Sequence, residues 1–118
     1  MSRSESHTPG IARSLALLRA REAGDDLQGV LLSLLRCGPE DATAVGHAIV
    51  ERAEVEDDPL LSDALGEALG TLWARHGAPA AGALDRLPEV ARTAARATYA
   101  ILKREALPEG GPTAEGEA

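Results

Sequence analysis

The segment DDPLLSDALGEALGTLW, residues 57–73, combines a strong helix start with two residues that weaken helices. Asp58 followed by Pro59 is typical of a helix N-terminus, because the carboxylate caps free backbone N–H groups and the proline ring already has a helical φ. Gly66 and Gly70 follow one turn apart, and each costs about 0.5–1 kcal/mol relative to alanine inside a helix. Two such glycines indicate a helix whose backbone approaches another element closely.

Two stripes run along this helix at helical spacing. The larger side chains form the stripe Leu61, Leu65, Ala68, Leu69 and Leu72. The smaller ones form the neighbouring stripe Ser62, Gly66, Gly70 and Ala74, and Trp73 lies where the two meet. Charged residues on the same helix exclude a membrane span. The small stripe therefore predicts close packing against a helix of the same chain, or alternatively a dimer face or ligand groove beside Trp73.

Alanine and leucine dominate the composition: the 118 residues include 23 Ala and 17 Leu, but no Phe and no Asn. Both are strong helix formers, whereas the β-branched and aromatic residues that favour strands are scarce. The chain is therefore expected to be all-α, with about five helices in an orthogonal helical bundle. Start and stop signals place four helices at about 11–23, 27–36, 39–54 and 57–76, the last ended by Gly77, and a fifth that begins near 85–88 and runs to about 105.

These helices fit a single domain over residues 10–105. We expect a disordered N-terminus at 1–9 and a disordered acidic tail at 106–118, because both are polar and offer little to bury. With neither an apolar leader nor an apolar run of membrane length, the chain is expected to be cytoplasmic and to have no membrane partner.

The fifth helix has an apolar side and a charged side. Its spacing predicts that the inward residues are Leu87, Val90, Ala91, Ala94, Ala97, Thr98 and Ile101. The outward residues would be Arg92, Arg96, Tyr99 and Lys103, here called the basic stripe. Three interpretations of this stripe stay open: a solubilising face, a surface for an acidic segment or a phosphate backbone, and a self-association surface.

The segment after Asp58 resembles one helix of a HEAT-type repeat. The resemblance rests on Asp58, Pro59, Leu61, Ala64, Leu65, Ala68, Leu69, Gly70 and Leu72. This chain departs from the pattern at Ser62, where the family often carries arginine. The resemblance covers roughly half of the chain and implies a short HEAT-like α-solenoid, whose stacked repeats present a surface to partners.

No set of residues forms a recognisable catalytic or metal-binding motif. His47 and Glu51 have the spacing of helical metal ligands, but a zinc site needs three or four ligands. Cys37, the only cysteine, follows a helix C-terminus, where the dipole disfavours a thiolate, so we expect a buried, inert thiol. We therefore expect no enzyme activity, no metal and no cofactor.

The net charge of −7 disfavours nucleic-acid binding and favours a basic protein partner. One acidic cluster is a candidate docking patch: Glu51, Glu54, Glu56, Asp57 and Asp58. The main hypothesis is a non-catalytic protein–protein interaction module that binds another protein or a second copy through this cluster, the Gly66/Gly70/Trp73 face or the basic stripe. The alternatives are a bacterial immunity or antitoxin-like inhibitor of a basic toxin, and a nucleic-acid-binding protein that uses the basic stripe.

Overall fold

The computed structural model describes residues 11–20, 27–77, 79 and 82–105. Within these ranges the chain is an all-α bundle without strands, as predicted. Its elements are α1 (Ile11–Ala20), α2 (Leu27–Leu34), α3 (Pro39–Glu54), α4 (Pro59–His76), the short 3-10 helix η2 (Leu84–Arg86) and α5 (Glu89–Lys103). The expected disorder at 1–9 and 106–118, and the end of the first helix at 21–23, lie outside the described residues.

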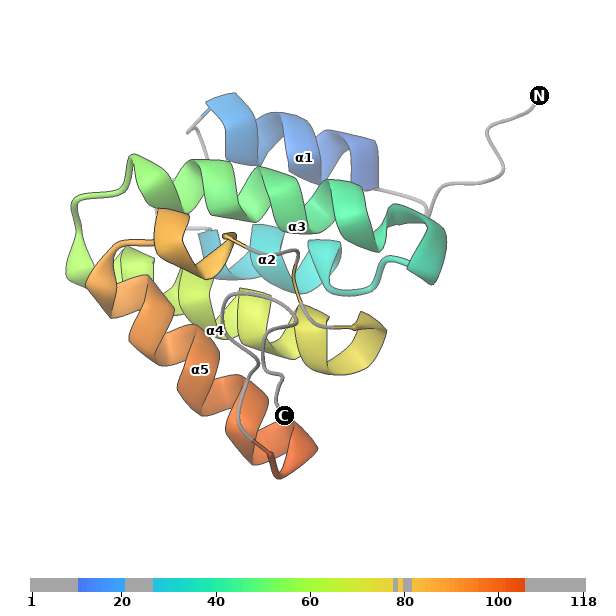
Figure 1. Ribbon diagram of the computed structural model, residues 1–118. Coiled ribbons are helices and arrows are strands. Elements are labelled where there is room, and N and C mark those ends of the chain that lie inside the picture. The colour runs from blue at the N-terminus through green and yellow to red at the C-terminus, as the bar shows by residue number, and fades with distance from the viewer. Residues whose placement is uncertain (1–10, 21–26, 78, 80–81, 106–118) are drawn as a thin grey trace.

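Helix α4 is the central element of the bundle, because it packs against α2, α3 and α5 (Figure 1). Its larger stripe supplies Leu65, Leu69 and Leu72 to the core, each essentially inaccessible to solvent. Leucines of α1 and α2 and the apolar side of α3 complete that core. The leucine stripe seen in the sequence is thus the side of α4 that faces the other helices.

Both ends of α4 are formed by the residues that the sequence predicts for a helix start and a helix end. The Asp58 carboxylate accepts a hydrogen bond of 2.9 Å from the backbone N–H of Leu60, and Pro59 occupies the first turn. At the other end Gly77 adopts a φ of +122°, a conformation that side chains disfavour, and its N–H bonds to the Trp73 carbonyl. These contacts fix the length of α4 from local chemistry alone.

The close neighbour of Gly66 and Gly70 is α5 of the same chain. A Cβ atom added at Gly66 would overlap the carbonyl oxygen of Ala91 and lie 2.8 Å from the Ala94 Cβ. At Gly70 it would lie 2.7 Å from both the Ala95 carbonyl oxygen and the Thr98 Cβ. The interpretation as internal packing is therefore confirmed. The alternative that the two glycines form a dimer face or ligand groove is wrong, because α5 covers them.

These contacts also show that α4 and α5 run in the same direction. Gly66 meets Ala91 and Ala94, whereas Gly70, one turn later, meets Ala95 and Thr98. Both helices accordingly run from left to right in Figure 1. The residues between them must therefore return along the length of α4 before α5 begins.

The rotation of α5 about its axis differs from the prediction. Val90 and Ile101, expected to face inward, are 40% and 75% exposed, and Ala97 is exposed as well. Tyr99, expected to face outward, is only 4% exposed. The cause is the close approach at the glycines, which leaves room for alanine and threonine but not for valine or isoleucine. Alanines 91, 94 and 95 are buried, and Val90 and Ile101 turn toward solvent.

The same substitution at two helical glycines should have opposite effects on stability. Gly66→Ala should lower the free energy of unfolding by about 1–3 kcal/mol, because the new methyl group overlaps the α5 backbone. Gly46→Ala should raise it by about 0.5–1 kcal/mol, because alanine favours the helix. A Cβ at Gly46 would meet only ordinary contacts, at 3.4 Å from Leu72 Cδ2 and 3.8 Å from Trp73 Nε1.

Urea unfolding of both variants against the unmodified chain measures these changes. A Gly66→Ala variant as stable as the unmodified chain would contradict the close approach of α4 and α5.

Candidate binding pocket and surfaces

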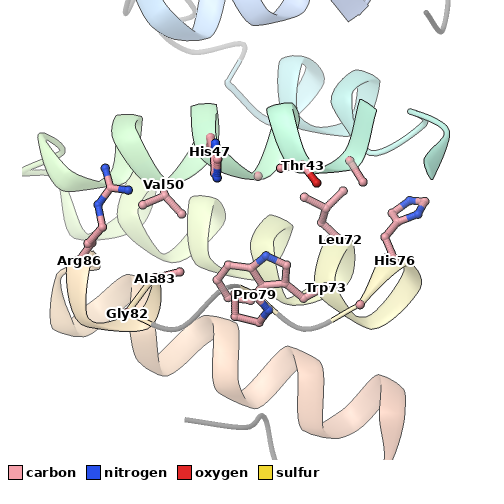
Figure 2. A pocket seen from close by; sticks show the side chains of 13 residues that line it. Thr43, His47, Val50, Leu72, Trp73, His76, Pro79, Gly82, Ala83 and Arg86 are labelled. Atoms are coloured by element: carbon pink, nitrogen blue, oxygen red, sulfur yellow. The ribbon is translucent and has the colours of Figure 1, made fainter. Parts of the chain in front are cut away.

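A cavity of about 400 Å³, here called the Trp73 pocket, lies between α3, α4 and the chain that connects α4 to α5 (Figure 2). Because α4 and α5 run in the same direction, this connecting chain doubles back along α4. Its residues Pro79, Gly82, Ala83 and Arg86 line one side of the cavity. The pocket is thus a consequence of the parallel arrangement of α4 and α5.

Trp73 forms one wall of this pocket and is only 6% exposed. Its ring nitrogen lies on the side of α3, near Gly46, and no described residue accepts a hydrogen bond from its N–H. Trp73 therefore borders a ligand-sized space, as one sequence hypothesis suggested. Neither Gly66 nor Gly70 lines that space, so the groove is formed with α3 and not on the glycine side of α4.

Polar groups surround the apolar walls of the pocket. Figure 2 shows Arg86 at one end, His76 at the other, and Thr43 and His47 on α3 above the Trp73 ring. Within the part of the chain that the structure describes, no acidic residue lines the pocket. Nothing in the sequence pattern links Thr43, His76 and Arg86, because these residues come from three segments far apart in the chain.

The charge of Arg86 is largely offset by Glu54 at the end of α3. The Arg86 Nε and a terminal guanidinium nitrogen donate hydrogen bonds of 2.8 and 3.0 Å to the two Glu54 carboxylate oxygens. These bonds hold the pKa of Glu54 below its ordinary value and raise the pKa of Arg86. The pair fastens the connecting chain to α3 at one end of the pocket.

Most of the predicted acidic docking patch is engaged within the chain. Besides Glu54, Glu56 forms an ion pair of 2.6 Å with Arg52 and also accepts a hydrogen bond from the Asp58 backbone N–H. The Asp58 carboxylate caps α4. Glu51 and Asp57 are exposed. Three of the five candidate acids therefore have structural roles, and a partner would meet mainly Glu51 and Asp57.

The predicted basic stripe does not form as a continuous outward surface. Tyr99 is buried because of the rotation of α5, which corrects its assignment to the outer side. Arg92 is partly buried and donates a hydrogen bond of 2.9 Å to the Leu87 carbonyl oxygen. Arg96 and Lys103 are exposed. The surface that remains for an anion is smaller than the sequence indicates.

A mixed apolar and acidic surface, which the sequence did not predict, lies along α4 and α5. When two right-handed helices run in the same direction, residues that follow the contact positions on one helix share a side with residues that precede them on the other. Glu67 follows Gly66, and Val90 precedes Ala91. The outer face so defined comprises Leu60, Asp63 and Glu67 of α4 with Val90, Ala97 and Ile101 of α5, all of them exposed.

Burial on the opposite side of the helix pair agrees with this assignment. Leu69 precedes Gly70 and Tyr99 follows Thr98, so both should lie on the core side of the pair, and both are buried. On the outer face, partial burial raises the pKa of Glu67, and the neighbouring Asp63 carboxylate raises it further. Ionised Glu67 is therefore slightly unfavourable in the folded chain.

Cys37 lies at the end of α2 and is buried. Burial raises the pKa of its thiol, and the carboxylates of Asp41 and Glu40 add to that effect. A thiol in these surroundings has little thiolate and is a poor nucleophile. Within the described residues, no three potential metal ligands come together, and His47 and Glu51 stay an exposed pair on α3. None of the described helices is both long and apolar enough to cross a membrane.

The chain matches no protein-family model, no curated protein and no solved structure at a significant level. The resemblance to a HEAT-type repeat therefore stays a prediction.

Replacing Glu67 by glutamine should stabilise the protein in a pH-dependent way. Since the pKa of Glu67 is raised in the folded state, its ionised form destabilises the fold above that pKa, and the effect disappears below the ordinary glutamate pKa. Glu67→Gln should therefore raise the free energy of unfolding at pH 7 by a few tenths of a kcal/mol, about the value of exposed charges. The difference from the unmodified chain should vanish near pH 3.

Chemical unfolding at both pH values tests this, with Glu51→Gln as the control on the exposed side of α3. A loss of stability for Glu67→Gln at pH 7 would show that a cation pairs with Glu67.

Proposed function

We propose that this protein is a non-catalytic protein-binding module that holds a basic amphipathic helix of another protein on its outer face. The observation that carries the proposal is the orientation of α5, which buries its alanines and exposes Val90 and Ile101. Complete burial of an exposed side chain of this size contributes about 1.5–3 kcal/mol, of which Ile101, at 75% exposed, can supply most and Val90, at 40%, less than half. An exposed apolar row on an otherwise charged surface is typical of a binding site.

The charges beside this row favour a basic partner. Asp63 and Glu67 lie one turn apart on α4, along the exposed apolar row of α5. Partial burial and the neighbouring Asp63 carboxylate raise the pKa of Glu67, and the positive charges of a bound helix would favour its ionised form. An amphipathic helix with lysine or arginine beside its apolar side therefore matches both parts of the outer face.

The outer face is a better candidate than the two clusters expected from the sequence. The acidic cluster has three of its five carboxylates engaged, and the basic stripe has lost Tyr99 to the interior. A toxin-binding or nucleic-acid-binding role would have to use what remains of these clusters.

A designed amphipathic peptide tests the proposal, with a leucine side flanked by lysines, labelled with fluorescein and compared with a scrambled peptide of the same composition. The unmodified chain should bind the ordered peptide at least about tenfold more tightly, measured by fluorescence anisotropy. The double variant Val90→Ser/Ile101→Ser should lose at least about tenfold in affinity, the loss expected for a central apolar contact. Asp63→Asn/Glu67→Gln should bind more weakly and depend less on salt.

The matched control is Glu51→Gln/Asp57→Asn, which removes the same number of charges from the acidic cluster and should leave peptide affinity nearly unchanged. Loss of binding in this control, with the Val90/Ile101 variant unaffected, would reject the outer face in favour of the acidic cluster. Equal affinity for the ordered and scrambled peptides would show attraction by charge alone and would likewise reject the proposal.

A further inference from the structure

The Trp73 pocket presents an indole N–H for which the described part of the chain supplies no acceptor (Figure 2). Trp73 is only 6% exposed, yet no acceptor for its indole N–H occurs in the part of the chain that the structure describes. The ring nitrogen points toward α3, into the cavity (Figure 2). An N–H that borders a cavity is available to an acceptor on a bound molecule, and small-molecule sites fix their ligands with a few polar groups of this kind. The geometry thus marks a position for an acceptor that enters from outside.

Two more donors lie above the same ring. Thr43 and His47 are one turn apart on α3, and Figure 2 shows both on the side of α3 that faces the Trp73 nitrogen. Both side chains are exposed and free to adjust to a ligand. A hydroxyl, an imidazole and an indole N–H directed at one region form a donor set suited to a carboxylate.

The charges around the pocket agree with an anionic ligand. The chain carries a net charge of −7, but none of the described residues that line this cavity is acidic. At one end of the pocket, the Glu54 carboxylate is held by two hydrogen bonds from Arg86, and the Glu51 charge also acts on that guanidinium. The described lining of this cavity therefore contains hydrogen-bond donors and no acidic side chain, although the protein as a whole is acidic.

The remaining walls are apolar and leave room for a hydrocarbon chain. Val50, Leu72 and Ala83 line the cavity together with the face of the Trp73 ring. Its volume of about 400 Å³ lies in the lower part of the range for small-molecule sites, which bind an apolar body and fix it with a few polar groups. We propose that the Trp73 pocket binds a small carboxylic acid with an apolar body, of the medium-chain fatty acid class.

Trp73 is the only tryptophan in the chain, so its fluorescence reports directly on the pocket. The probes are octanoate, 1-octanol and octylammonium, which share one hydrocarbon chain and differ in charge. Octanoate should change Trp73 emission in a saturable way, with octanol binding at least about tenfold more weakly and octylammonium more weakly still. Hexanoate, two methylene groups shorter, should also bind about tenfold more weakly than octanoate.

Two variants connect the signal with this site. Thr43→Phe should block the pocket and reduce octanoate affinity at least about tenfold, and His47→Leu should cause a similar loss by removing a donor. Thr93→Phe makes the same exchange at an exposed threonine of α5 that does not line the pocket, and should leave binding unchanged. Far-UV circular dichroism confirms that each variant keeps its helices.

Three results would overturn the proposal. Octanol or octylammonium binding as tightly as octanoate would reject the carboxylate site. Unchanged affinity in both Thr43→Phe and His47→Leu would place the ligand elsewhere. No saturable change of Trp73 emission with octanoate would show that the pocket binds no ligand of this class. Because the outer face lies on the other side of α4, these outcomes are independent of those for the amphipathic peptide.

Discussion

The contact between the glycine stripe of α4 and the backbone of α5 determines most of this structure. Gly66 and Gly70 let the two helices approach until carbonyl oxygens of α5 lie where glycine Cβ atoms would be. Only small side chains fit opposite such a surface, so α5 turns its alanines inward. The positions that meet also show that the two helices run in the same direction. The helix propensity lost at two glycines is offset by packing that no larger residue would allow.

Two possible binding surfaces follow from that one contact. The rotation of α5 leaves Val90, Ala97 and Ile101 beside the carboxylates of α4 on the outer face. The parallel direction forces the connecting chain back along α4, where it closes the Trp73 pocket against α3. The two surfaces lie on different sides of α4 and suit different ligands, a basic helix and a small carboxylic acid. Binding at one therefore leaves the other accessible.

Features set by nearby residues could be predicted from the sequence. The Asp58–Pro59 start of α4, the glycine at its end and the leucine stripe all depend on contacts within a few residues or on simple periodicity. Packing of the two glycines against another helix of the same chain was also predicted, because that is the usual role of a stripe of small residues on a helix that also carries charges. The all-α class followed from the alanine and leucine content.

The rotation of α5 could not be predicted in this way. An amphipathic pattern predicts that the largest apolar residues face inward, whereas the narrow space at Gly66 and Gly70 admits only the smallest side chains of α5. That error moved Tyr99 to the wrong side and hid the outer face. The sequence suggested a groove beside Trp73 but placed it at the two glycines, because Thr43, Trp73 and Arg86 come together only through the return of the chain along α4. The Glu54–Arg86 pair likewise joins residues distant in sequence, so an acid that looked free is engaged.

The rotation of α5 is the point on which both surfaces depend, and solution NMR measures it directly. In a uniformly labelled sample, nuclear Overhauser effects should connect the Gly66 α-protons with the Ala94 methyl group, and the Gly70 α-protons with Thr98. The Val90 and Ile101 methyl groups should show no such effects to either glycine. Strong effects from Val90 or Ile101 to these glycines would show the opposite rotation of α5, and both the outer face and the explanation for the two glycines would then be wrong.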